Sequence, residues 1–376
     1  MTSLRRSPLA DRHRGMGANL APFAGWEMPL DYGSVVAEHR AIREVCGVFD
    51  LSHLGTIVLT GAGAADCLQR ALTNDVHALE IGRAHYTLCL DDGGGIVDDL
   101  LCYRLPWGYF TVPNAANAAA VLAALQACAG ADVEVRDVKD GLACLAVQGP
   151  ESPRALVEAG IDVGDLAYLD CEVLAIADPD VDPDTQDVGA ANAGIPPAGA
   201  ILARSGYTGE QGYELFVPAE RAGDLWNRIT AGGATPAGLG ARDTLRLEMG
   251  YPLHGNDISP ATTPVEARLG WACKGSGFRG EAAYRRAKEA GASRRLWGLR
   301  ALDRGIPRAG CAVLADGEAV GEVTSGTFSP TLRIGIAMGY LAAGLDAGER
   351  VVIDVRGKEV PAEVVRPPFV DADPKR

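Results

Sequence analysis

The sequence predicts an α+β fold with more than one domain and an all-β region at its C-terminal end. Three observations support this prediction. The 376 residues, at about 150 per domain, are enough for two or three cores. Strand and helix patterns are mixed without the regular alternation of a doubly wound sheet. From about Arg294 onward, helical patterning fades and short runs alternate apolar and polar residues between turns.

The first helix is predicted over residues 34–46, where apolar side chains fall on one stripe, Ser34 can cap the start and Gly47 can end the helix. Strand patterns, most of them separated by Gly, Asn or Asp, follow at residues 56–60, 96–105, 109–113, 132–138 and 142–148. Helical patterns lie among them and beyond them, at residues 64–72, 115–127, 152–159, 219–231 and 241–249.

Residues 178–200 repeat Asp-Pro-Asp and continue into a Gly/Ala/Pro stretch, which predicts an exposed acidic loop. Their spacing lacks the glycine hinge and terminal Glu of a calcium-binding EF-hand loop. The all-β region is predicted to begin after a boundary within residues 280–295, in the basic segment 285–288. Its strands are expected at residues 296–301, 311–315, 320–324, 333–338, 350–355 and 359–365.

Composition narrows the classes of function. Hydrophobic residues make up 47% and charged residues 22%, a balance typical of a folded globular chain. The 35 Lys and Arg against 49 Asp and Glu give a net charge of −14, so nucleic acid is a poor partner. No apolar run approaches the roughly 20 residues of a membrane span, and residues 1–20 lack the apolar centre of a secretory signal. We therefore expect a cytoplasmic protein that contacts neither nucleic acid nor membrane.

Nine cysteines are present, none of them in a Cys-x-x-Cys pair. Most have apolar neighbours, as Cys102 and Cys144 do, which is typical of small buried side chains in a reducing cytosol. We expect no metal site. His39 and His53 also lack metal-ligand spacing to another His or Cys, so hydrogen-bonded structural roles are expected for both.

Several common catalytic motifs are missing from the sequence. There is no Walker loop, no His-Glu-x-x-His and no Gly-x-Ser-x-Gly. The nearest match to a dinucleotide fingerprint, residues 238–243, ends in Asp and follows no apolar strand.

Carboxylates at two places in the sequence are candidates for a functional site. Asp98 and Asp99 lie between a triple-glycine turn and an apolar run, so on a strand one faces the core and the other faces water. The inward carboxylate could cap a turn or belong to a site. Glu214 interrupts another apolar strand. It could accept two parallel N–H donors of a ligand such as a pterin edge, or form an ion pair with Arg242 or Arg246.

Aromatic residues could supply stacking faces for a flat heterocycle, although each could equally pack in a core. These residues are Tyr86, Tyr103, Tyr168, Tyr207 and Trp271.

The segments that carry these residues resemble the aminomethyltransferase family of the glycine cleavage system, the T-proteins. Matching motifs occur in the family's order from about residue 8 to about residue 369. They are residues 23–29, 38–39, 49–55, 73–75, 94–100, 114–117, 148–150, 206–210, 236–243 and 325–330.

This resemblance implies a fold, a reaction and a partner. Residues 1–285 would form a folate-binding catalytic region of two discontinuous, intertwined α/β subdomains, and residues 286–376 a β-barrel domain. The lipoylated H-protein would present an aminomethyl group on its dihydrolipoyl arm. Tetrahydrofolate would take the methylene carbon, giving 5,10-methylenetetrahydrofolate and ammonia. The H-protein docking surface stays open, with basic runs as candidates at residues 5–6, 12–14, 285–286 and 294–295.

The resemblance also assigns roles to residues. Asp99 matches the family residue beside the reacting folate nitrogens, where it could orient the folate and stabilise positive charge. Glu214 matches the residue that holds the pterin edge, and Arg242 matches a folate-site arginine. The remaining expected folate contacts are Tyr86, Tyr103, Asn114, Tyr168, Tyr207 and Trp271.

One departure concerns the C-terminal end, where family members often carry an aromatic residue after a Pro-Phe pair. Here Phe369 is followed by Val370, which removes one expected folate contact. Two other readings remain: a tetrahydrofolate-dependent demethylase of a methylated amine or sulfonium compound, and a non-catalytic folate-binding iron–sulfur assembly factor. The second would carry Lys-Gly-Cys-Tyr where this chain has residues 204–207, Arg-Ser-Gly-Tyr. The length excludes an oxidase with an attached flavin domain.

Overall fold

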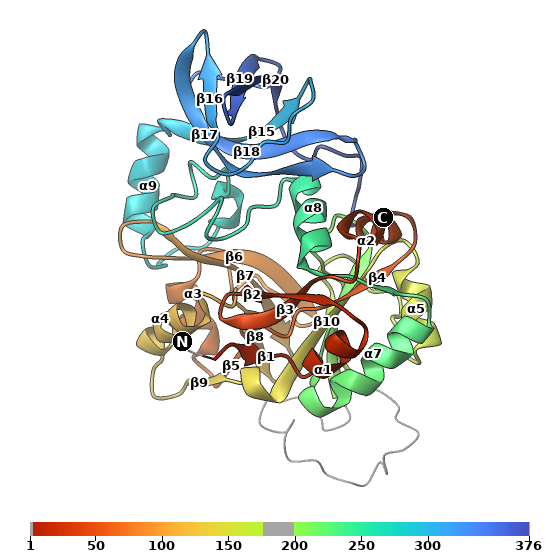
Figure 1. The fold of residues 1–376 in the computed structure, drawn as a ribbon. Coiled ribbons are helices and arrows are strands. Elements are labelled where there is room, and N and C mark those ends of the chain that lie inside the picture. The colour runs from red at the N-terminus through yellow and green to blue at the C-terminus, as the bar shows by residue number, and fades with distance from the viewer. Residues whose placement is uncertain (1–2, 176–198, 376) are drawn as a thin grey trace.

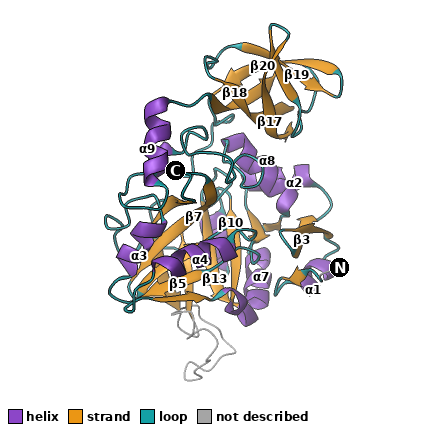
Figure 2. Cartoon of the chain, turned by 90° about the vertical axis from the view of Figure 1, so that its left-hand side faces the viewer, coloured by secondary structure: helices purple, strands orange, loops and turns teal. Residues whose placement is uncertain are grey.

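The computed structural model describes residues 3–175 and 199–375. Two large sheets with flanking helices, one antiparallel and one mixed, form the larger body, and a closed barrel of six antiparallel strands lies above it (Figure 1). The predicted α+β class with a C-terminal all-β unit is thereby confirmed. Helices α8 (Leu239–Met249) and α9 (Glu281–Ala290) lie between the body and the barrel in both views (Figures 1 and 2).

The first large sheet carries the two neighbouring aspartates. Its strand order is β6 (Arg83–Leu90), β7 (Ile96–Leu105), β8 (Gly108–Val112), β5 (Ile57–Thr60) and β9 (Glu134–Asp137). Helices α3 (Ala64–Ala71) and α4 (Ala118–Cys128) pack on one face through an apolar cluster. The predicted bounds of β7 are confirmed. Strand β6 was not predicted, because its apolar residues gather at one end and do not alternate.

The second large sheet carries Glu214. Its order is β11 (Cys171–Ala175), β12 (Gly199–Ala203), β13 (Gly212–Pro218), β10 (Leu142–Gln148), β4 (Gly47–Asp50) and β14 (Thr235–Pro236). Strands β10 and β13 pair antiparallel and are buried along their whole lengths. Helices α5 (Ser152–Glu158) and α7 (Ala222–Ala231) contribute buried side chains to the core of this sheet.

The predicted loop over residues 178–200 lies outside the described residues except at its end. There the prediction is wrong, because Gly199 and Ala200 are buried in β12 and pair with β11. Their small side chains resemble loop composition but suit a strand enclosed on both faces.

The N-terminal region contains helices and strands that were mostly not predicted. A three-stranded sheet has the order β1 (Arg5–Arg6), β3 (Trp26–Asp31) and β2 (Asn19–Phe23), and helix α1 (Ala10–Gly15) lies between β1 and β2 in the chain. These elements are too short to show a clear periodicity. The predicted first helix is confirmed as α2 (Val35–Glu44), and the Ser34 hydroxyl accepts a hydrogen bond from the backbone N–H of Ala37 as an N-cap.

The barrel follows the predicted strands closely. Its order is β15 (Arg294–Ala301), β18 (Ile334–Ala342), β17 (Glu318–Ser329), β16 (Ala312–Ala315), β19 (Arg350–Val355) and β20 (Lys358–Val365). Strands β17 and β18 are longer than predicted. The segment where the boundary was expected belongs to α9. Three short 3₁₀ turns complete the described elements: η1 (Lys139–Gly141), η2 (Ala219–Arg221) and η3 (Gly270–Ala272).

All nine cysteines are free, and six of them are buried, in line with the sequence. Among the described residues, no helix has the length and apolar character to cross a membrane.

Candidate active site

Two adjacent carboxylates lie on β7, and they face opposite ways as predicted. Asp98 is completely buried, whereas Asp99 is half-buried. Asp98 accepts hydrogen bonds from the backbone N–H of Asn114 (3.0 Å) and from the side-chain amides of Asn114 (2.8 Å) and Asn117 (2.7 Å). These three donors compensate for the loss of water around a buried carboxylate. Asp98 therefore acts as a support for the loop that precedes α4.

Asp99 is held by groups that leave it facing the site. Tyr86 donates its hydroxyl to Oδ2 (2.9 Å), and the amide of Asn114 donates to Oδ1 (3.0 Å). Burial raises the pKa of Asp99, and the hydrogen bond from Tyr86 opposes that rise. Burial and the charge of Asp99 raise the pKa of Asp98 to about 7. The pair thus takes up a proton more readily than ordinary carboxyl groups do.

Two stacked aromatic pairs lie close to these carboxylates. Tyr86 stacks on Trp271, with ring centroids 5.2 Å apart and an interplanar angle of 24°. Tyr207 stacks on Tyr251 at 5.6 Å and 29°. Trp271 is 56% exposed, so its pair marks the rim where solvent reaches the site. The charge of Asp99 contributes, after burial, to a raised pKa of Tyr207, which places the second pair near the same carboxylate.

Glu214 lies on β13 and is 7% exposed. Its Oε2 accepts hydrogen bonds from the hydroxyls of Ser205 (2.5 Å) and Tyr103 (3.5 Å). Its Oε1 has no hydrogen-bond partner among the described residues. The alternative of an ion pair with Arg242 or Arg246 is not observed within the described chain. Arg246 pairs instead with Asp243 and Asp257, and Arg242 forms no ion pair with a described carboxylate.

Arg242 lies in the first turn of α8 with an incomplete set of partners. Its guanidinium stands 4.6 Å from the centroid of the Tyr207 ring. The buried Nη1 atom has no hydrogen-bond partner among the described residues. Burial lowers the pKa of this guanidinium, while the nearby charge of Glu214 raises it. A buried N–H group without an acceptor is costly, which makes this atom a candidate for contact with a ligand.

The remaining predicted residues lie in the same region but differ in how far their side chains are buried. Tyr103 is fully buried and touches the site only through its hydroxyl on Glu214, so it positions that carboxylate. Tyr168 is half-buried, and the charges of Glu214 and Asp373 add to the effect of burial in raising its pKa. Asn114 links Asp98 to Asp99. The structure thus brings all nine predicted site residues together from β6, β7, β13, α8, η3 and three connecting segments.

Sequence reasoning missed four further neighbours. Asn117 and Ser205 lie inside segments that had been singled out, but only their contacts to Asp98 and Glu214 reveal their roles. Tyr251 gave no signal, because its partner Tyr207 is distant in sequence. His254, whose Nε2–H donates to the backbone oxygen of Ile96 (3.0 Å), is close enough to lower the pKa of Asp99.

The two histidines with expected structural roles differ from each other. His39 is fully buried and contacts the hydroxyls of Thr244 (2.8 Å) and Thr331 (3.0 Å), as expected. The expectation is wrong for His53, whose buried Nδ1 has no hydrogen-bond partner among the described residues. Burial, followed by the charge of Arg242, lowers the pKa of His53 to about 3, so this imidazole is neutral.

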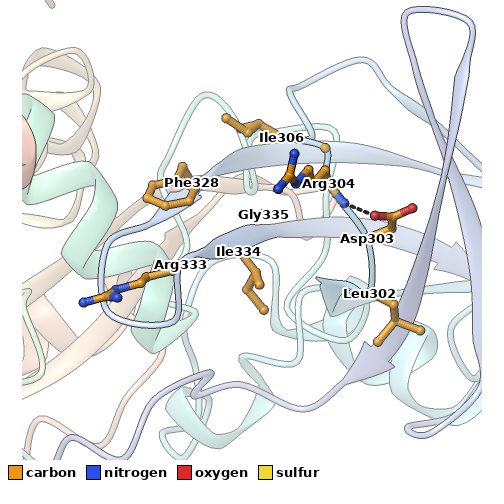
Figure 3. A pocket seen from close by; sticks show the side chains of 9 residues that line it. Leu302, Asp303, Arg304, Ile306, Phe328, Arg333, Ile334 and Gly335 are labelled. Carbon is orange, nitrogen blue, oxygen red and sulfur yellow. Dashed lines mark hydrogen bonds between the residues drawn. The ribbon is translucent and has the colours of Figure 1, made fainter.

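A separate hollow opens on the barrel (Figure 3). None of the nine predicted site residues lines it, so it is distinct from the candidate site. Its lining residues are Leu302, Asp303, Arg304, Gly305, Ile306, Phe328, Arg333, Ile334 and Gly335.

The C-terminal segment passes beside the candidate site. After burial, the charge of Asp373 contributes to the raised pKa of Tyr168 and of Tyr251. Val370, at the position where an aromatic residue was expected by resemblance, is half-buried.

Comparisons with known proteins agree with this architecture. A family model described as the GCVT N-terminal domain matches residues 9–276, and one described as the glycine cleavage T-protein C-terminal barrel domain matches residues 294–371. An aminomethyltransferase of Frankia alni is 48% identical over 386 aligned residues, covering 100% of both chains. One of Mycolicibacterium paratuberculosis is 46% identical, covering 98% of this chain and 97% of the relative. The crystal structure of glycine cleavage system aminomethyltransferase T from Bartonella henselae superposes with a TM-score of 0.88 at 35% identity, covering 99% of each chain.

Proposed function

The chain belongs to the glycine cleavage T-protein family and is an aminomethyltransferase, and from that premise we propose how its site works. The substrate is an aminomethyl group on the dihydrolipoyl arm of H-protein, and the acceptor is tetrahydrofolate. The methylene carbon becomes bonded to folate nitrogens 5 and 10. Their two protons leave on the released ammonia and the regenerated thiol.

The observation that carries this proposal is the pair of unsatisfied groups at one end of the site. Glu214 Oε1 lacks a donor, and the buried Nη1 of Arg242 lacks an acceptor, among the described residues. A pterin edge offers parallel N–H donors that suit a carboxylate. It also carries acceptors that suit a guanidinium. The Tyr207–Tyr251 pair offers a flat face beside these groups.

At the other end of the site, we assign the chemical step to Asp99. Tyr86 and Asn114 fix the direction of its carboxylate through both oxygens. A fixed carboxylate in a half-buried position stabilises the positive charge that develops on the methylene carbon as ammonia leaves. The raised pKa of the Asp98–Asp99 pair also suits a group that accepts a proton from a folate nitrogen.

The wider organisation follows from the same premise. We propose that residues 1–285 form the folate-binding catalytic region and residues 286–376 the barrel domain. H-protein must dock where its arm reaches Asp99. The exposed Trp271, which stacks on Tyr86, marks an open approach to that carboxylate. The nine free cysteines suit a reducing cytoplasm.

The test is release of ammonia from aminomethylated H-protein by the purified protein with and without tetrahydrofolate. We expect release to depend on both substrates and to yield 5,10-methylenetetrahydrofolate. The matched comparison replaces aminomethylated H-protein with a methylated amine or sulfonium compound. Transfer from that compound, with none from H-protein known to be active with another enzyme of the family, would identify a demethylase and overturn the proposal.

A further inference from the structure

The turn that follows α8 reaches both ends of the candidate site. At one end, Tyr251 of this turn stacks on Tyr207. At the other end, the Nε2–H of His254 donates a hydrogen bond to the backbone oxygen of Ile96 (3.0 Å), at the start of β7. Strand β7 also carries Asp99, the residue to which we assign the chemical step. His254 therefore connects the turn to the strand of that carboxylate.

A β-bulge brings Ile96 and Asp99 to the same face of β7. Opposite residues of an antiparallel pair point to one face, and Asp99 lies opposite Leu88 whereas Ile96 lies opposite Leu90. Leu88 and Leu90 share a face because they are two residues apart on β6. The register shift leaves Val97 as the extra residue of β7. Without this bulge, residues 96 and 99 would face opposite ways, so the bulge brings the contact of His254 to the side of Asp99.

Residues 254–262 fix the start of β7 from this face. The backbone N–H of Ile96 donates to the backbone oxygen of Thr262 (3.0 Å), so both backbone polar groups of Ile96 bond to this segment. A Cβ atom on Gly95 would lie 2.1 Å from the backbone oxygen of Pro260, which shows how closely the two backbones approach. The half-buried imidazole is therefore held at a defined place beside the face that carries the reacting carboxylate.

His254 can supply a positive charge near Asp99. Its Nδ1 atom has no hydrogen-bond partner among the described residues, so this nitrogen can take up a proton while Nε2 keeps its bond to Ile96. Histidine is the side chain whose charge changes near neutral pH. Burial raises the pKa of Asp99, and both the hydrogen bond from Tyr86 and the charge of His254 oppose that rise.

The other titratable groups around Asp99 act differently. Asp98 on β7 adds negative charge, and burial raises the pKa of Tyr86 and of Tyr207 so that both hydroxyls stay neutral. The two arginines of α8 lower the pKa of Tyr207 after the larger effect of burial, and one of them is already paired with an aspartate of the same turn as His254. Of these groups, only His254 gains a positive charge as the pH falls through the neutral range.

We propose that His254 is a positioning residue for Asp99, which fixes the start of β7 through Nε2 and, once protonated, keeps the Asp99 carboxylate ionised as the pH falls. This inference rests on the proposed function, because it assumes that the transfer needs the negative charge of Asp99. The attraction between imidazolium and carboxylate opposes protonation of the carboxylate. The enzyme therefore keeps its reacting carboxylate to a lower pH than burial alone would allow.

The experiment compares the pH dependence of turnover in the full-length wild type and in His254→Gln. Turnover is measured as ammonia release from aminomethylated H-protein at saturating tetrahydrofolate. The Gln side chain keeps an N–H donor for Ile96 but never carries a charge. We expect His254→Gln to match the wild type at about pH 9, where an imidazole is neutral. At about pH 6 it should be about threefold to tenfold slower, because the attraction on Asp99 is lost.

A second variant, His254→Leu, removes the donor as well as the charge. The backbone oxygen of Ile96 then loses a hydrogen bond, so turnover should fall by about threefold to tenfold even at about pH 9. The dissociation constant of tetrahydrofolate, measured by calorimetry at the same pH, should stay close to the wild-type value in both variants. The reason is that Glu214 and Arg242, to which we assign the pterin contacts, are unchanged.

The control is His77→Gln, the same substitution at an exposed histidine whose Nε2 lies 3.4 Å from Asp66. This variant should keep the wild-type pH profile. A melting temperature close to that of the wild type shows for each variant that the fold is intact.

The outcomes separate this inference from the proposed function. If the wild type releases no ammonia from active H-protein, the proposed function fails and this inference fails with it. If the wild type is active and His254→Gln has the same pH profile, the charge of His254 has no part in the reaction and only the inference is overturned. If His254→Gln is slowed by one factor at every pH, the imidazole has a structural role alone, which also overturns the inference.

Discussion

The molecule contains two groups of buried charged side chains that differ in how completely they are paired. The first joins α8 to the barrel. There Glu248 accepts hydrogen bonds from Arg43 (2.8 Å) and Thr331 (2.9 Å), and a further one from Ser329. Arg246 donates to Asp257 (2.7 Å), and it is likewise bonded to Asp243 and Ser325. The second group is the candidate site, where the buried Nη1 of Arg242 has no hydrogen-bond partner and Oε1 of Glu214 accepts no hydrogen bond among the described residues.

The contrast is sharpest on a single helix. Arg242 and Arg246 lie one turn apart on α8, yet only Arg246 has carboxylate partners. Burying a charge is costly unless it is paired. The paired group can therefore be explained by folding alone, since it fixes the barrel on the body. The unpaired group cannot, and its members are the residues that we assign to substrate. Incomplete pairing, more than burial or charge, therefore separates these two groups of charged side chains.

The largest effect is expected for Asp99→Asn, which removes the charge beside the reacting carbon. Turnover should fall by roughly 10²–10⁴-fold, the usual contribution of a catalytic acid or base. Folate affinity should change far less, because Glu214 and Arg242 remain. Steady-state kinetics and calorimetry measure the two quantities. Asp92→Asn, an exposed aspartate on the preceding turn, is the control and should behave as wild type. Unchanged turnover in Asp99→Asn would remove this residue from the mechanism.

The second prediction compares the loss of stability when each of the two arginines of α8 is replaced by Met. Arg246→Met leaves the buried Asp257 without its cation, so the free energy of unfolding should fall by about 3–5 kcal/mol. Arg242→Met removes a guanidinium that has no carboxylate partner in the described chain, so stability should change by only about 1 kcal/mol or less. Folate affinity should nevertheless decrease. Urea unfolding measures both changes. Equal destabilisation by the two substitutions would show that Arg242 stabilises the fold as much as Arg246 does.

A smaller effect is expected for Glu214→Gln. The amide presents an N–H donor to the N–H donors of the pterin, so folate affinity should weaken by roughly 10–100-fold, as for a lost hydrogen bond to a charged group. Turnover at saturating folate should be affected less. Calorimetric titration measures the affinity. An unchanged dissociation constant would refute the assigned contact between Glu214 and the pterin.

The smallest expected effect is on the pH dependence of turnover. Burial raises the pKa of Asp99, and burial with the Asp99 charge raises that of Asp98 to about 7. The catalytic carboxylate is therefore lost as pH falls through this raised range, and turnover should decrease at a higher pH than ordinary carboxyl groups would give. Tyr86→Phe removes a hydrogen bond that lowers the pKa of Asp99, so it should move this acid limb to still higher pH. A limb at lower pH in the variant would contradict the assignment.

Protonation of the Asp98–Asp99 pair also affects the free energy of unfolding. A carboxyl whose pKa is raised on folding binds protons more tightly in the native state than in the unfolded state. Asp98 therefore lowers the free energy of unfolding as pH rises from about 4 to about 7. Its three hydrogen bonds limit this cost.

Local patterns predicted the parts of the fold that have a regular period. Strands β7 and β10 have the expected bounds because apolar runs end at turn residues. The short N-terminal strands and β6 lack such a period, and so they were missed. The pairing between α8 and its partners could not be predicted either, because Arg43 and Glu248 are 205 residues apart. Sequence patterns singled out Asp99, Glu214 and the aromatic candidates, and the resemblance supplied their roles, whereas their state of pairing is visible only in the folded structure.

We expect tetrahydrofolate to satisfy the unpaired groups of the site and to leave the paired network of Arg246 and Glu248 unchanged. A crystal structure of the complex with tetrahydrofolate tests it most directly. We predict that Glu214 Oε1 gains an N–H donor from the pterin and that Arg242 Nη1 gains an acceptor from the ligand. The contacts of Arg246 and Glu248 should keep their present partners. A folate bound elsewhere, or one bound here with Arg242 Nη1 still without a partner, would show that these groups do not hold the substrate.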